Sequence, residues 1–189
     1  MATATETLTP TETLSGTYTL DPAHSRIGFV ARHAMVTKVR GSFNEVEGEG
    51  YFDAGSPERS RLEVTIKAES IDTRNADRDA HLRSNDFFDM ESYPEIRFSS
   101  TAVEPLEGGV YKVTGDLTIK GVTNPVTFEL EYTGAVNDPF GNQRIGFEGN
   151  VTVNRKDWGV NWNATLEAGG VLVSEKIVLE FEISAVKKV

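Results

Sequence analysis

The sequence contains no cysteine among its 189 residues. The chain therefore has no disulfide framework, no thiol nucleophile and no thiolate ligand for a metal ion. Histidine is also scarce, since the chain carries only His24, His33 and His81. Their spacings match no metal-binding motif, so we expect hydrogen-bonded structural histidines and no metal site.

Positive charge and long apolar runs are also lacking. The chain has 19 basic and 29 acidic residues, which gives a formal net charge of -10. Nucleic acids and anionic membrane surfaces favour a basic footprint, so neither is expected as the main partner. No stretch approaches the run of about 18 apolar residues that spans a membrane as a helix. The start, MATATETLTPTETLSG, shows no basic region followed by an apolar one, so we expect no signal peptide and a cytoplasmic protein without stable membrane insertion.

The usual sequence signatures of catalysis are absent as well. The chain contains no GxSxG, Walker or GxGxxG pattern. Its carboxylates lie in exposed alternation or in turns, without a convergent partner for acid–base chemistry. We therefore expect no catalytic residues, no cofactor and no enzymatic activity.

What the chain does contain is a regular alternation of apolar and polar residues. In the clearest run, RLEVTIKA at residues 61–68, every second residue is apolar. Similar runs, mostly joined by short turns, predict about eight strands. Closure into a barrel would remove the unpaired edges of such a sheet. We predict an all-β fold, an eight-stranded antiparallel β-barrel over residues 16–189, preceded by a disordered tail at residues 1–15, which are rich in Thr and Glu.

One segment, residues 71–101, interrupts the strand pattern. Asn75 is a favourable N-cap residue, and Asp77 and Asp79 would lie near the positive end of a helix dipole. Residues 76–84 contain no Gly, Pro or β-branched residue. We predict a short α-helical insertion near residues 75–84 that caps the mouth or flank of the barrel. We interpret the next two aromatic residues, Phe87 and Phe88, as packing anchors of this cap. Further along the chain, Trp158 is interpreted as a plug of the barrel.

The apolar residues of the strands are expected to point into the barrel. Large aromatic members of this set occur with small ones such as Ala31, Gly41 and Gly115, a mixture that favours a cavity over the alternative, a solid core. His33 shares the inward phase of the strand and lies near its end, so it either lines the cavity or caps a turn. We predict a lumen lined by Phe29, Ala31, His33, Phe43, Val64, Ile66, Phe98, Leu117, Phe128, Leu130, Phe147, Val151, Leu179 and Phe181.

Five motifs, taken in order, resemble those of the YceI-like family. They are YTLDPAHS at 18–25, GSF at 41–43, RDAHLRSNDFFD at 78–89, GDLTIKGVT at 115–123 and RKDWG at 155–159. The resemblance covers about residues 16–186. It implies a lipocalin-like barrel with a helix beside it, an isoprenoid or other long-chain amphiphile in the lumen, and a homodimer.

The leading hypothesis is non-catalytic binding, storage or transport of a polyprenyl, quinone-type or fatty-acid-like molecule. Each buried methylene-sized group contributes about 0.8 kcal/mol, so an apolar tunnel suffices to hold the tail. Arg74, Arg78 and Arg83 are the candidates for binding an anionic head group; the alternative for Arg78 and Arg83 is a salt bridge to a nearby aspartate. Two other hypotheses are a small barrel enzyme acting on a hydrophobic substrate, with His33 or an arginine as its polar group, and a dimerising interaction module.

Overall fold

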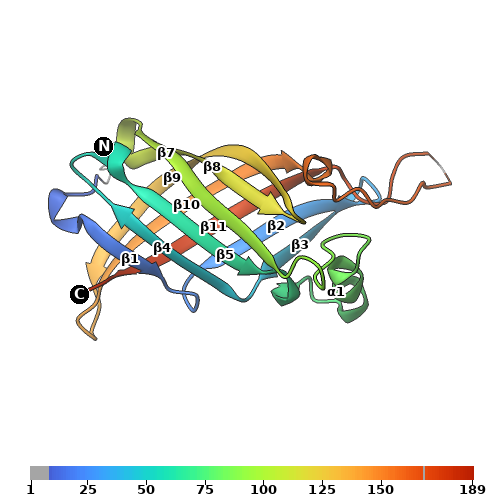
Figure 1. Cartoon of the computed structure of the whole chain (residues 1–189), viewed down its shortest axis with the longest axis horizontal. Coiled ribbons are helices and arrows are strands. Elements are labelled where there is room, and N and C mark those ends of the chain that lie inside the picture. The colour runs from blue at the N-terminus through green and yellow to red at the C-terminus, as the bar shows by residue number, and fades with distance from the viewer. Residues whose placement is uncertain (1–8, 168) are drawn as a thin grey trace, which may run out of the picture.

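The computed structural model describes residues 9–167 and 169–189, and most of these residues form one elongated barrel of antiparallel strands (Figure 1). The strands are β1 (Gly16–Leu20), β2 (Arg26–His33), β3 (Thr37–Phe43), β4 (Val46–Phe52), β5 (Arg61–Lys67), β6 (Ile71–Asp72), β7 (Glu95–Pro105), β8 (Val110–Ile119), β9 (Val122–Asn137), β10 (Gln143–Asn154) and β11 (Lys176–Lys187). The helical elements are α1 (Ala76–Arg83) and five 3₁₀ turns, Glu12–Leu14, Pro57–Arg59, Ala68–Ser70, Glu107–Gly109 and Arg155–Trp158.

The barrel is closed by eight strands in the order β1, β4, β5, β7, β8, β9, β10 and β11. The ring closes because β11 pairs with β10 along one edge and with β1 along the other. Closure leaves no free edge in this ring, which is the physical advantage that a barrel has over an open sheet. The predicted eight-stranded antiparallel β-barrel is confirmed.

Strands β1 and β2 follow one another along the same side of β11. Strand β1 pairs with the last residues of β11, and β2 pairs with residues 178–182 of the same strand. Strands β3 and β4 follow one another in the same manner, since β2 pairs with β3 and β1 pairs with β4. Residues 16–33 and 37–52 therefore form one long hairpin, interrupted where Asp21-Pro22 breaks the alternation.

The wall of the barrel is incomplete beside β3. On the side away from β2, the described pairings of β3 involve only Ser42 and Phe43, which pair with the short strand β6. Helix α1 and the segment that follows it lie next to this part of the barrel (Figure 1), and the ring of Phe88 contacts Phe43 at a centroid distance of 6.0 Å. The α1 segment therefore takes the place of a strand at this end.

Helix α1 begins as predicted. The side chain of Asn75 accepts a hydrogen bond from the backbone N–H of Arg78 at 3.0 Å, which is an N-cap interaction. Asp79 is buried, and its carboxylate accepts hydrogen bonds from both the backbone N–H and the hydroxyl of Thr73. The short helix is thus fixed to the residues that precede it, and the predicted helical insertion is confirmed.

The opposite end of the barrel is covered by residues that precede β1. The predicted tail falls partly on residues 1–8, which lie outside the described residues. Further along, Glu12–Leu14 forms a 3₁₀ turn, and Leu14 is only 8% exposed. The hydroxyl of Tyr18 donates a hydrogen bond to the carbonyl of Leu14 at 2.7 Å. Residues 12–14 therefore differ from the predicted tail, because Leu14 packs against a cluster of tyrosines.

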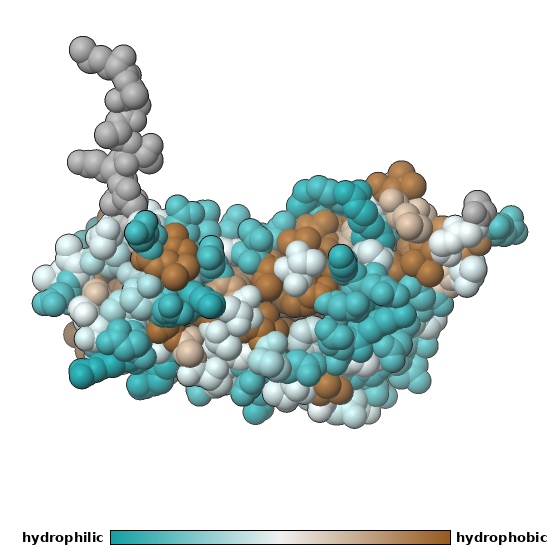
Figure 2. Space-filling view, turned by 90° about the horizontal axis from the view of Figure 1, so that it is seen from above, coloured by the Kyte–Doolittle hydropathy of each residue, from teal (hydrophilic) through white to brown (hydrophobic). Residues whose placement is uncertain are grey.

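The outer surface is mainly hydrophilic on the face shown in Figure 2, with hydrophobic residues gathered in patches. The most exposed large apolar side chains on described strands and turns include Val36 in the β2–β3 turn and Phe140 in the β9–β10 turn. Among the described residues, no helix is long and apolar enough to cross a membrane.

Candidate ligand-binding cavity

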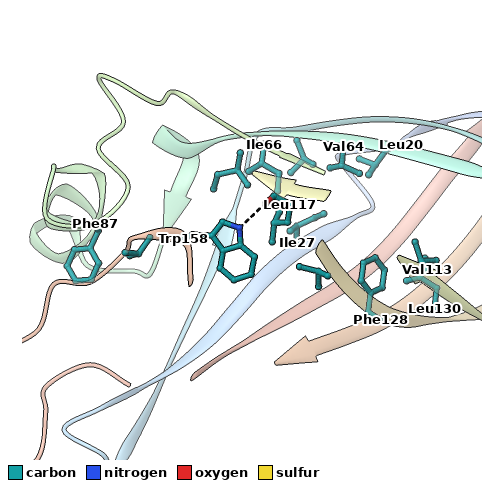
Figure 3. Packing of buried hydrophobic residues seen from close by; sticks show 14 residues of the cluster. Leu20, Ile27, Val64, Ile66, Phe87, Val113, Leu117, Phe128, Leu130 and Trp158 are labelled. Carbon is teal, nitrogen blue, oxygen red and sulfur yellow. Dashed lines mark hydrogen bonds between the residues drawn. The ribbon is translucent and has the colours of Figure 1, made fainter. Parts of the chain in front are cut away.

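The barrel encloses an apolar cavity of about 190 Å³. Its wall is formed by inward-pointing residues of the strands, by side chains that follow or belong to α1, and by the segment after β10. Figure 3 shows Ile66, Leu117 and Phe128 among the residues that project between the strands, with Trp158 and Phe87 toward the α1 end. Arg155 is the single charged residue among those described as lining the cavity. The interior is therefore hollow, and its wall offers carbon atoms almost exclusively.

The alternation of the sequence located most of this wall correctly. Of the residues predicted to line the lumen, all except His33 and Phe147 line this cavity. The ones that do are Phe29, Ala31, Phe43, Val64, Ile66, Phe98, Leu117, Phe128, Leu130, Val151, Leu179 and Phe181. Their contact with a ligand stays a prediction.

His33 does not line the cavity, so the prediction is wrong for this residue. It is exposed at the end of β2, and its carbonyl accepts a hydrogen bond from the N–H of Val36 at 3.0 Å. The backbone of His33 thus closes the β2–β3 turn, which was the alternative interpretation. The physical reason is that β2 and β3 extend past the end of the cavity. The alternation of β2 therefore continues to His33, where there is no longer a cavity for the side chain to line.

Phe147 points into the barrel, but it lines a second cavity of about 100 Å³ at the end near Leu14. Its ring contacts those of Phe52 and Tyr111, at centroid distances of 5.7 and 6.1 Å. Burial raises the pKa of the Tyr111 phenol, and the neighbouring Tyr132 adds to this shift. This end of the barrel is therefore an aromatic cluster distinct from the main cavity.

The three candidate head-group arginines lie outside the cavity wall. Arg74 has a positive φ of 65° and is exposed. Arg78 donates from Nε to the hydroxyl of Thr73 and from Nη2 to its carbonyl, both at 2.7 Å. Arg83 donates from Nε to the carbonyl of Glu69 at 2.9 Å and from Nη2 to that of Ile71. The salt-bridge alternative is wrong, because among the described residues Arg78 and Arg83 bond to oxygens of the backbone and of Thr73, not to aspartates. Binding of a head group by the three arginines stays a prediction.

Arg155 was missed by sequence reasoning, although it belongs to the RKDWG motif. It is 7% exposed and donates to three carbonyl oxygens, those of Ser174 (2.8 Å), Val160 (2.7 Å) and Val173 (3.3 Å). Burial lowers the pKa of this guanidinium, while the charge of Glu175 opposes that shift. Arg155 therefore ties together the two ends of the segment between β10 and β11, and it also lines the cavity.

Aromatic residues close the α1 end of the cavity. Trp158 is 3% exposed, and its indole N–H donates to the carbonyl of Leu117 on β8 at 2.8 Å (Figure 3). This position agrees with its interpretation as a plug. Phe87 packs against Trp162 at a centroid distance of 5.3 Å, and both Phe87 and Phe88 also line the cavity. The predicted packing anchors are therefore part of the wall as well.

The histidines lie in separate places. His24 contacts the carboxylate of Asp21 through Nδ1 at 2.7 Å, and His81 contacts Asp86 through Nε2 at 2.8 Å. In the part of the chain that the structure describes, no group of three or more His, Asp or Glu side chains could hold a metal ion. The chemistry available in the cavity is thus apolar contact.

Closure of the barrel around an apolar hollow places this chain in a class of small β-barrels whose interior has room for one small hydrophobic molecule. The family model described as YceI-like domain matches residues 18–185. The chain therefore belongs to the YceI-like family.

Relatives in sequence and structure agree with this assignment. A UPF0312 protein of Photorhabdus laumondii is 44% identical over 76% of this chain and 73% of its own length. A UPF0312 protein of Staphylococcus aureus is 39% identical, over 89% of this chain and 95% of its own. The crystal structure of the Campylobacter jejuni YCEI protein has a TM-score of 0.72 and 32% identity, and covers 84% of this chain and 90% of that one. A polyisoprenoid binding domain from Saccharophagus degradans shares the fold, with a TM-score of 0.66 at 14% identity over 90% of this chain and 98% of that one.

Proposed function

We propose that this protein binds the hydrophobic tail of a long-chain amphiphile, such as a polyprenyl, quinone-type or fatty-acid-like molecule, inside the barrel and without chemical conversion. The observation that carries the proposal is the hollow, almost wholly apolar lumen. An empty apolar cavity costs stability because its lining lacks contact partners, and an apolar guest restores those contacts. The name of the Saccharophagus degradans domain, polyisoprenoid binding, supports the same chemistry for this fold.

The polar groups around the cavity support a role in binding the tail rather than in catalysis. The guanidinium N–H groups of Arg155 donate to backbone carbonyls, and the indole N–H of Trp158 donates to the backbone carbonyl of Leu117. A general acid or base must reach the reacting atom of a substrate, and His33, the candidate for that role, lies outside the lumen. These contacts argue against the alternative of a small barrel enzyme.

The proposal is tested by direct binding with the purified full chain. The Trp162→Phe variant leaves Trp158, at the cavity wall, as the sole tryptophan. Titration with geranylgeraniol is expected to change the fluorescence of Trp158 saturably, and organic extraction followed by mass spectrometry is expected to recover the bound lipid. Absence of both signals, in a protein whose circular dichroism shows the expected β-sheet, would refute the proposal.

A matched pair of variants assigns the binding to the lumen. Val151 lines the cavity, and the next residue, Thr152, is exposed. Val151→Phe is expected to fill part of the space and weaken binding about tenfold, equivalent to about 1.4 kcal/mol. Thr152→Phe adds a comparable ring on the opposite side of the strand and should leave the affinity unchanged. Equal effects of the two substitutions would contradict a site in the lumen.

The resemblance to the family also supports a homodimer as part of the proposal. Light scattering of the eluting protein during size exclusion would measure the mass, and a mass of one chain at all concentrations would contradict a dimer.

A further inference from the structure

The lumen of this barrel is divided into two compartments. The main cavity of about 190 Å³ reaches the α1 end, and a second one of about 100 Å³ lies toward the Leu14 end. Both are lined mainly by apolar side chains. The second compartment has no role in the binding proposed above, although it lies in the same barrel.

Three side chains separate the compartments, because each of them lines both. They are Leu62 on β5, Leu130 on β9 and Ile183 on β11. We propose that these three residues form a septum that limits the length of the bound chain, and that the compartment beyond it is a binding site for the distal end of longer chains. This inference rests on the proposed binding of a hydrophobic tail in the main cavity.

The septum consists of three aliphatic side chains, two of which lie beside a glycine on the neighbouring strand. Leu62 pairs with Gly50 on β4, and Leu130 pairs with Gly149 on β10. A Cβ atom added at Gly149 would lie 3.0 Å from Cδ2 of Leu130, so this leucine lies against the bare backbone of its neighbour. With glycines beside both leucines, the leucine side chains themselves supply the bulk at this level of the lumen. Truncating one of them should therefore join the two compartments.

Beyond the septum the second compartment is walled largely by apolar and aromatic side chains, and Glu49, Ser60 and Arg61 also line it. Its lining includes the rings of Tyr18, Phe52, Tyr111 and Phe147. The hydroxyl of Tyr18 donates to the carbonyl of Leu14, which holds the 3₁₀ turn Glu12–Leu14 over this end. The site thus suits the terminal part of an unbranched or methyl-branched hydrocarbon chain, which needs room and apolar contact but no polar partner.

The test compares chain-length preference in matched leucine-to-alanine variants of the full chain. Leu130→Ala opens the septum, whereas Leu179→Ala makes the same truncation in the main cavity only. Dissociation constants are measured for prenyl alcohols from farnesol to solanesol. Leu130→Ala is expected to raise the affinity for the longest alcohols relative to the shortest about tenfold, equivalent to about 1.4 kcal/mol. Leu179→Ala should leave that ratio unchanged.

Two further variants keep the test decisive. Ile183→Ala repeats the opening if Leu130→Ala fails to fold. Ala185 lines only the second compartment. Adding Ala185→Phe to Leu130→Ala should therefore fill that compartment and abolish the gain in affinity for long alcohols. Equal length profiles for the septum variants and Leu179→Ala would overturn the septum while leaving the proposed function standing. Failure of the wild-type protein to bind any of the alcohols would instead overturn the proposed function, and the septum with it.

Discussion

The ring of Phe29 on β2 lies directly over Gly41, its paired residue on β3. A Cβ atom added at Gly41 would lie 2.3 Å from Cζ of Phe29. Phe98 lies diagonally across from Gly115, and a Cβ atom added at Gly115 would lie 2.4 Å from Cζ of Phe98. Glycine in these positions leaves room for the end of an aromatic ring against the barrel wall. The hollow therefore depends on glycines placed beside large rings.

The first prediction is that Gly41→Ala drives the ring of Phe29 into the cavity. The clash cannot be relieved on the wall side, so overpacking should cost about 1–3 kcal/mol of unfolding free energy and weaken ligand binding. Urea unfolding and the geranylgeraniol titration measure the two effects. Gly55→Ala is the control, because Gly55 lies outside the cavity wall and the nearest contact of its Cβ would be the end of the exposed Glu12 side chain. A Phe29→Leu substitution should partly rescue Gly41→Ala; no rescue would show that the ring is not the cause.

The second prediction concerns the buried guanidinium of Arg155. Arg155→Met leaves the carbonyls of Val160 and Ser174 without the donor that reaches them, which should cost about 2–4 kcal/mol. Amide hydrogen exchange between residues 160 and 174 should accelerate as well. The neighbouring Lys156→Met removes only an exposed pair with Glu175 and should cost about 0–1 kcal/mol. Similar losses for both variants would contradict the anchoring role of Arg155.

Strand alternation predicted which side chains point inward, but not how far along the barrel each one lies. A half-buried strand repeats every two residues whether or not a cavity is beside it. For this reason Leu117 and Leu179 were placed correctly, whereas His33 shares their inward phase and lies beyond the lumen. Phe147 likewise points inward but lies past the septum. The axial position depends on the bend and register of the strands, which are tertiary features.

The contacts of the segment between β10 and β11, and those of the arginines near α1, could not be predicted from any local pattern. Arg155 bonds to carbonyls 18 and 19 residues away along the chain, and Trp158 bonds to one 41 residues away. The arginines near α1 resembled an anion site in sequence, yet Arg78 and Arg83 bond to nearby oxygens of β6 and its neighbours. In the sequence, Gly41 and Gly115 favour a cavity as small inward residues, whereas in the structure the rings of Phe29 and Phe98 lie against them. These arrangements follow from packing between distant segments.

The third prediction is a loss of stability in acid that depends on Asp138. The backbone N–H of Asn142, together with the Arg144 guanidinium, lowers the pKa of Asp138 from 3.8 to about 2. Because the folded-state pKa lies below the unfolded one, this contribution is complete above a pH of about 4 and is lost as the pH falls through about 2. The midpoint of urea unfolding, measured at a series of pH values between about 4 and 2, should fall less steeply with decreasing pH in Asp138→Asn than in the wild-type protein. Glu107→Gln, at an exposed turn, should retain the wild-type slope; the same slope for Asp138→Asn would refute the assignment.

The fourth prediction separates the two tryptophans, because only one of them has a hydrogen bond to the barrel among the described contacts. Trp158→Phe keeps an aromatic ring in the wall but leaves the carbonyl of Leu117 without its indole donor, so it should cost about 1–3 kcal/mol. Trp162→Phe preserves ring contacts with His81 and Phe87 and should change stability by about 0.5 kcal/mol or less. Denaturant unfolding followed by circular dichroism measures both without relying on tryptophan emission. A Trp162→Phe loss as large as that of Trp158→Phe would mean that ring packing, rather than the bond to Leu117, holds this end of the cavity closed.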